Sequence, residues 1–212
     1  MESWRRLGPF SFGQENAPVS WTAFLKGVSD LAPGLLDGLA PPATAADLQA
    51  LTAALNSPLP EDVHQVLATH NGQRAGHRIL FGLTLMSAQD IARHARSVAH
   101  ALEREGLVPV EDLDRRTQAY EPNPHHVPLF TDNTGNFLGF DLAPSASGVW
   151  GQVVIFGLDL PRPRVVADSF HTLFEELSAE LRQGNYRIKD VGGYSSMSWK
   201  PGNGSALSEI LL

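Results

Sequence analysis

Residues 126–142 read HVPLFTDNTGNFLGFDL, two apolar runs separated by a cluster of turn-forming residues. The Asp, Asn, Thr and Gly residues between the runs favour a tight turn. Strands joined by a short turn are antiparallel neighbours, because a parallel crossover needs about a dozen residues or more. The stretch therefore predicts a β-hairpin.

Other segments of the chain extend this hairpin into a larger fold. Further strand-like apolar runs lie at residues 79–83, 150–156 and 164–167. Stretches with the apolar spacing of a helix begin near Trp21, Thr44, Pro60, Ser87 and Ser169. This order predicts an α+β fold, with a single antiparallel-dominated mixed sheet packed against helices on one face.

The distribution of Pro and Gly residues suggests where the folded domain begins and ends. Residues 1–20 mix these residues with aromatic side chains and show no periodicity, which predicts an irregular N-terminal arm. The domain itself is expected over residues 21–186, and an irregular C-terminal tail over residues 187–212. Within the domain, the polar residues 107–124 read as an exposed loop.

The composition excludes several classes of protein. The chain of 212 residues carries 16 Lys and Arg against 23 Asp and Glu, a net charge of −7, which argues against a nucleic-acid partner. Cysteine is absent, so disulfides, thiolate metal sites and a cysteine nucleophile are excluded. No stretch approaches 18 consecutive apolar residues, and the initial MESWRR is not followed by the apolar segment of a secretory signal. We therefore expect a cytoplasmic protein that does not contact a membrane.

The known short motifs predict neither catalysis nor metal binding. The eight histidines are poorly spaced for a metal; His64 and His70, for example, are six residues apart and do not share a helix face. Residues 132–136 superficially resemble a calcium loop, but Phe137 and Ala143 occupy the positions where that loop needs Gly and Glu. We expect no metal, no cofactor and no catalytic residue.

Two polar residues, Asp141 and Gln152, interrupt strongly apolar strand sequences. The commoner explanation is that they mark the solvated face of a half-covered sheet. The alternative is that this face, with Asp132 and Asn136 at its rim, binds a partner. In that case replacing Asp141 and Gln152 together with alanine should weaken binding and leave the thermal midpoint of unfolding nearly unchanged.

Four blocks of sequence, in order, resemble the Smi/Knr-type, or cell-wall assembly regulator, branch of the SUKH superfamily. The blocks are LPED (59–62) with HNGQ (70–73), VPLFTDNTGNFLGFDLAP (127–144), GVWGQVVIF (148–156) and VADSF (166–170). Together the resemblance covers roughly residues 21–182. It implies an α+β fold and a protein-binding role without known catalytic activity.

The strand pattern and the resemblance together suggest roles for individual positions. Structural roles are expected for Pro60, Gly72, Gly135, Gly151 and Ser169. The candidate partner-binding residues are Asp132, Asn136, Asp141, Trp150, Gln152 and Asp168.

Three functions are consistent with these observations. The first is an immunity protein that neutralises a cognate toxin of a bacterial polymorphic toxin system, in which the acidic surface would suit a basic toxin domain. The alternative is a regulator or scaffold protein in cell-wall or envelope assembly. The third is a hydrolase that uses His125 or His126 with Asp132.

Overall fold

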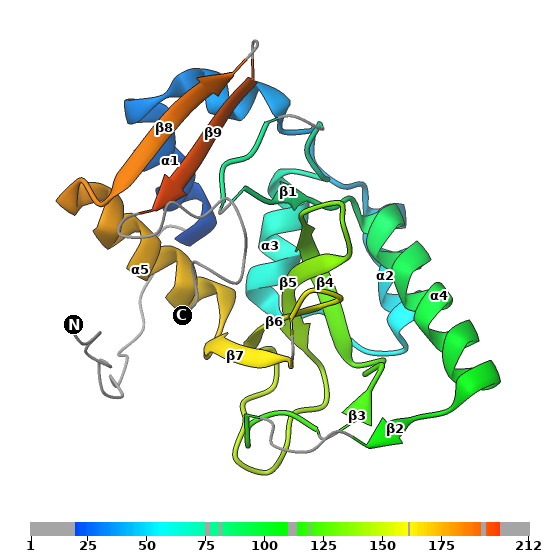
Figure 1. Ribbon diagram of the computed structural model, residues 1–212. Coiled ribbons are helices and arrows are strands. Elements are labelled where there is room, and N and C mark those ends of the chain that lie inside the picture. Colours follow the sequence, from blue (N-terminus) through cyan, green and yellow to red (C-terminus); the bar gives the residue numbers. More distant parts are fainter. Residues whose placement is uncertain are drawn as a thin grey trace.

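The fold is centred on a five-stranded sheet (Figure 1). The computed structural model describes residues 20–74, 77–80, 82–109, 114–118, 120–160, 162–191 and 194–199. The strands are β1 (Thr84–Leu85), β4 (His126–Thr131), β5 (Asn136–Asp141), β6 (Val153–Gly157) and β7 (Arg164–Ala167), in the order β1-β4-β5-β6-β7. The predicted hairpin is confirmed as β4–β5, and every neighbouring pair of the sheet is antiparallel.

Within the described residues, five α-helices and one 3-10 helix accompany the sheet. They are α1 (Ser20–Leu31), η1 (Pro33–Gly38), α2 (Ala45–Leu55), α3 (Glu61–Thr69), α4 (Ala88–Glu105) and α5 (Phe170–Gln183). Three of them begin where the sequence predicts a cap, because the side chains of Thr44, Ser87 and Ser169 each accept a hydrogen bond from a backbone N–H of the first turn. The α+β class is confirmed.

Aromatic side chains join the helices to one face of the sheet. Trp21 of α1 lies 4.9 Å, between ring centroids, from Phe174 of α5. Phe130 of β4 lies 6.0 Å from Phe170, the first residue of α5. These rings belong to the same buried core as Leu138 and Phe140 of β5, so the α1–α5 pair is fastened to the central hairpin.

The strand predicted at residues 79–83 is wrong. In the described part of that segment, Leu83 N–H donates to the Leu80 carbonyl oxygen at 2.7 Å, and Gly82 has a φ of 73°. A positive φ turns the chain sharply, since L-residues rarely adopt it. The strand that joins the sheet, β1, therefore starts only at Thr84.

The tail predicted as irregular contains a second hairpin. Strands β8 (Tyr186–Val191) and β9 (Tyr194–Trp199) pair antiparallel, and β9 contacts η1. Met197 of β9 is fully buried, and its N–H donates to the carbonyl oxygen of Arg78 at 3.0 Å. The prediction failed because this packing is set by contacts distant in sequence. Residues 200–212, and the arm predicted at residues 1–20 except for Ser20 in α1, lie outside the described residues.

The loop predicted at residues 107–124 is partly ordered by pairing. Strands β2 (Val108–Pro109) and β3 (Tyr120–Glu121) form a short two-stranded sheet of their own. Residues 114–118, between them, contact β7 and Gln152, the residue before β6, through the polar contacts described next.

Candidate binding site

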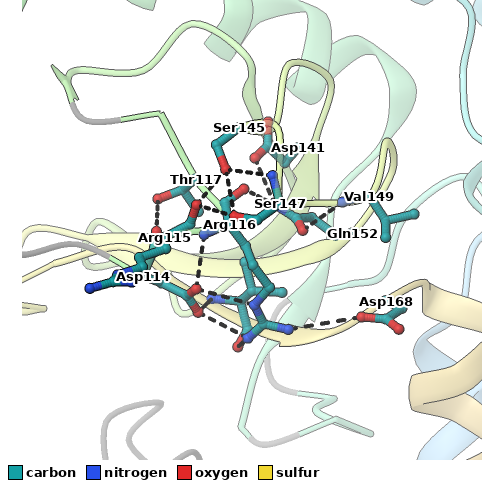
Figure 2. Close-up of polar contacts among 11 residues, drawn as sticks. Asp114, Arg115, Arg116, Thr117, Asp141, Ser145, Ser147, Val149, Gln152 and Asp168 are labelled. Atoms are coloured by element: carbon teal, nitrogen blue, oxygen red, sulfur yellow. Dashed lines mark hydrogen bonds and ion pairs between the residues drawn. The ribbon is translucent and has the colours of Figure 1, made fainter. Parts of the chain in front are cut away.

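A polar network centred on two fully buried side chains, Asp141 and Gln152, lies where β5 ends and β6 begins (Figure 2). The Gln152 amide nitrogen donates to Asp141 Oδ2 at 3.0 Å and to the Arg116 carbonyl oxygen at 2.8 Å. The Gln152 amide oxygen accepts from Val149 N–H at 3.1 Å, and Asp141 Oδ1 accepts from Ala143 N–H at 2.9 Å. One side chain, Gln152, therefore fastens three separate segments of the chain.

The expectation that Asp141 and Gln152 lie on an exposed sheet face is wrong. Both side chains have an exposed fraction of 0%. Buried polar groups are tolerated when they are hydrogen-bonded, and the segment carrying Arg116 supplies one of the partners from outside the sheet. The alternation of polar and apolar residues along a strand does not reveal that another segment of the chain covers its polar face. Direct contact of Asp141 and Gln152 with a partner stays a prediction.

The network holds a loop, residues 143–152, in one conformation. Ser145 and Ser147 donate their hydroxyls to the Arg115 carbonyl oxygen. Gly151 N–H donates to the Asp141 carbonyl oxygen at 2.8 Å, and Gly151 has a φ of 82°, which favours glycine. A Cβ at Gly151 would lie 3.1 Å from Pro60 Cγ, so the loop is seated against the start of α3.

An ion pair covers the outer edge of β7. The Arg116 guanidinium donates to Asp114 at 3.1 and 2.9 Å and to the Val165 carbonyl oxygen at 3.0 Å, while Asp114 accepts from Val165 N–H at 3.2 Å. Arg116 also lies 3.8 Å from Asp168, whose side chain is 70% exposed. Sequence reasoning missed Asp114 and Arg116 because an isolated acid–base pair in a polar stretch is not distinguishable from a solvated loop.

The electrostatics of this edge follow from the same contacts. Burial raises the pKa of Asp114, but the hydrogen bonds and positive charge of Arg116, together with Val165 N–H, outweigh burial and hold that pKa below its usual value. The hydrogen bond with Asp114 raises the pKa of Arg116 despite its partial burial. Both groups are therefore charged near neutral pH.

Asp132 and Asn136 organise the β4–β5 turn instead of joining this network. Asp132 accepts hydrogen bonds from the N–H groups of Thr134 and Asn136 at 2.7 and 3.0 Å. The Asn136 amide donates to Asp132 at 2.7 Å and to Asp159 at 2.8 Å. Burial raises the pKa of Asp132, but these bonds outweigh it and the net shift is downward.

The six predicted binding residues therefore lie in two places. Asn136 and Asp141 are the first and last residues of β5, so the two places are separated by the length of that strand. The pairing of His125 or His126 with Asp132 is also wrong, because the two histidines stand at the start of β4 and Asp132 follows its end, roughly 20 Å away at the rise of a β-strand. His126 is instead buried, 3.2 Å from the Asn123 amide and 3.7 Å from Asp141.

The residues predicted to have structural roles occupy special positions. Pro60 precedes α3 as its N-cap, and Ser169 caps α5 through Thr172 N–H. Gly72, Gly135 and Gly151 all have positive φ, at 100°, 114° and 82°. At Gly135 a Cβ would also approach Leu158 to 2.7 Å.

Within the described ranges, no group of three or more His, Cys, Asp or Glu side chains is placed to hold a metal ion. Among the same residues, no helix combines the length and apolarity needed to cross a membrane. The arrangement is one of buried hydrogen bonds that support an exposed loop.

Comparison with known sequences places this fold in a family. The model of the SMI1/KNR4 family (SUKH-1) matches residues 42–176, more than half of the chain. The chain belongs to this family. The matched region contains the buried network, the loop of residues 143–152 and the ion pair over β7.

The chain is similar to several fungal proteins, two of which are named as regulators. It is 32% identical over 164 residues to the "cell wall biosynthesis/cell cycle regulator smi1" of Schizosaccharomyces pombe, covering 70% of this chain and 32% of that protein. It is 29% identical over 230 residues to a "KNR4/SMI1 homolog" of Yarrowia lipolytica, covering 83% of this chain and 32% of that protein. A "glucan synthesis regulatory protein" of Neurospora crassa is 26% identical over 210 residues, covering 81% of this chain and 39% of its own length. The chain spans about one third of the length of the curated relatives it matches.

Proposed function

We propose that the chain is a non-catalytic protein-binding module that regulates cell-wall assembly. Two of the relatives above carry names that describe regulation of cell-wall or glucan synthesis. The absence of cysteine fits a reduced compartment, so we place this activity in the cytoplasm.

The observation that carries the binding role is the rigid loop of residues 143–152. Its hydrogen bonds lead to Arg115, Arg116 and Asp141, yet it leaves Val149 and Trp150 at the surface. A loop held in one conformation loses little conformational entropy when it binds, which favours recognition of another protein. The buried side chains of Asp141 and Gln152 hold this surface in place through their hydrogen bonds with each other and with Val149 N–H.

Regulation is favoured over the other two functions. Two of the relatives reported above are named as regulators, whereas toxin neutralisation stays a prediction from the resemblance alone. A hydrolase built on His126 and Asp132 is not supported, because the fold separates these residues by the length of β4.

Deletion of the gene in its source organism tests the proposal. We expect altered cell-wall polymer content and greater sensitivity to wall-degrading enzymes, both reversed by reintroducing the wild-type gene. A normal wall in the deletion strain would refute the regulatory role. Death of that strain on exposure to a co-encoded toxin, with a normal wall, would support immunity instead.

A further inference from the structure

Val149 and Trp150 form an exposed apolar knob at the tip of the rigid loop. Their exposed fractions are 50% and 45%, large values for such side chains next to a buried network. Isolated exposed hydrophobic residues are common, but tryptophan is strongly enriched among the residues that dominate binding energy at protein interfaces.

The knob is held in place before any partner arrives. Gln152 N–H donates to the Val149 carbonyl oxygen at 3.0 Å, and the Gln152 side chain accepts from Val149 N–H at 3.1 Å. Trp150 lies between Val149, which makes these hydrogen bonds, and Gly151, which packs against Pro60. The backbone that carries the knob is therefore ordered in the folded protein, which lowers the entropy cost of binding.

The surroundings of the knob are acidic. Pro60, which contacts Gly151, is followed by Glu61 and Asp62 in the first turn of α3. Asp62 accepts a hydrogen bond from His171 N–H at 3.0 Å, which brings this acidic turn against the start of α5 (Figure 1).

Further carboxylates lie along one element: Asp168 stands between β7 and α5, and Glu176 and Glu180 follow on α5. Asp168 is linked to Gln152 and Val149 through Arg116, as Figure 2 shows. Burial, followed by the negative charges of Asp168 and Glu180, raises the pKa of Glu176 on α5. The negative charges of Asp168 and Glu180 therefore act on Glu176; Arg116 offsets part of the charge of Asp168 at 3.8 Å, and a further cation would lower the remaining repulsion.

We propose that this knob is the anchor of a docking surface for a partner-protein segment that carries arginine or lysine beside an apolar side chain. The inference rests on the proposed function and names the chemistry of its partner. The apolar side chain packs against Val149, an arginine or lysine stacks on the Trp150 ring, and further basic groups face Asp168 and the acidic turn of α3. The net charge of −7 favours the approach of such a segment.

Binding of short synthetic peptides to the full chain tests the docking surface. The probe is a labelled octapeptide of alternating arginine and leucine, followed by fluorescence anisotropy; alternating glutamate and leucine, and alternating arginine and serine, are the comparison peptides. We expect binding of the arginine–leucine peptide only. Trp150→Ala should weaken it at least about ten-fold, and Asp168→Asn about three-fold, with the second effect shrinking as salt is raised.

Two variants serve as matched controls. Leu158→Ala removes an apolar side chain that is 85% exposed and lies outside the loop. Glu103→Gln removes an exposed carboxylate on α4. Both should bind the peptide as the wild type does, and all four variants should unfold at the wild-type midpoint.

Three results would overturn the docking proposal. They are wild-type affinity in Trp150→Ala, equal binding of the glutamate–leucine peptide, and no binding of the arginine–leucine peptide by the wild type. Reintroducing Trp150→Ala into the deletion strain separates the two proposals. Restoration of a normal wall by this variant would reject the docking surface and leave regulation standing, whereas failure of the wild-type gene to restore the wall would reject regulation.

Discussion

At the scale of single residues, Gln152 shows how a buried amide can determine the shape of a surface. Its nitrogen and oxygen contact Asp141, Arg116 and Val149, which belong to three different segments. A buried donor or acceptor that loses its partner costs free energy, because water does not replace the missing hydrogen bond. The amide therefore selects the one loop conformation in which all these groups are paired.

Replacing Asp141 with alanine should lower the free energy of unfolding by at least about 2 kcal/mol, since it removes the acceptor for Gln152 and for Ala143 N–H. Equilibrium denaturation in urea measures the loss. The double variant Asp141→Ala with Gln152→Ala should lose less than the sum of the single variants, because the two residues are mutual partners.

A loss of stability in the double variant would contradict the expectation from sequence that its thermal midpoint of unfolding is nearly unchanged. Asp30→Ala is the control, because the Asp30 side chain is 64% exposed in its pair with Lys26 and should contribute less than about 1 kcal/mol. Wild-type stability in Asp141→Ala would show that the buried network does not hold the loop.

At the scale of elements, the ion pair of Asp114 and Arg116 forms hydrogen bonds with the backbone of β7, as a neighbouring strand would. It satisfies the outward N–H and C=O of Val165, so that residue's backbone is not open to pairing with another chain. The same guanidinium approaches Asp168 at the start of α5. One side chain thus connects an irregular segment, a sheet edge and a helix.

The Asp114 contacts predict how stability depends on pH. The pKa of Asp114 is lowered in the folded protein, so its stabilising effect is complete above the pKa of an unfolded aspartate, about 3.9, and is lost as the pH falls through the lower folded value. Asp114→Asn should therefore flatten the decline in stability below about pH 4. Urea denaturation at a series of pH values measures this decline.

Arg116→Met provides the matched test of that explanation. Without the guanidinium, Asp114 keeps only backbone partners, so this variant should also show a weaker decline below about pH 4. The double variant should match Asp114→Asn. If both single variants lose stability below about pH 4 as the wild type does, other carboxylates cause that loss.

At the scale of the whole molecule, the C-terminal hairpin completes the core. Met197 of β9 is buried with the side chains of α1, α5 and the sheet, and Tyr186 and Ile188 of β8 pack against the same core. These contacts join residues near the end of the described chain to residues near its beginning. The unit of folding is therefore longer than the 42–176 segment that the family model matches.

Met197→Ala should lower the free energy of unfolding by about 2–5 kcal/mol, the range for truncating a buried methionine. Chemical denaturation followed by circular dichroism measures the loss. Leu158→Ala, at an exposed position, should change stability by no more than about 0.5 kcal/mol. Equal stabilities for the two variants would show that the hairpin packs too loosely to stabilise the domain.

Local sequence was sufficient to predict the features that depend on residues close together in the chain. The β4–β5 hairpin, the caps at Thr44 and Ser169 and the apolar face of α5 are set by turn residues, capping side chains and helical spacing within a few residues. The positive φ of Gly135 belongs to the same group. These features, with the family motifs, determined the α+β class.

Only the tertiary structure decided which polar residues meet. Asp141 and Gln152 read as surface residues because alternation along a strand says nothing about a segment folded over it, and Arg116 lies 36 residues before Gln152 in sequence. The burial of Met197 and the exposure of Trp150 likewise depend on packing between distant segments. Hydrogen bonds and burial are properties of the folded chain, so the sequence indicated the polar candidates and the fold determined which support the loop and which face a partner.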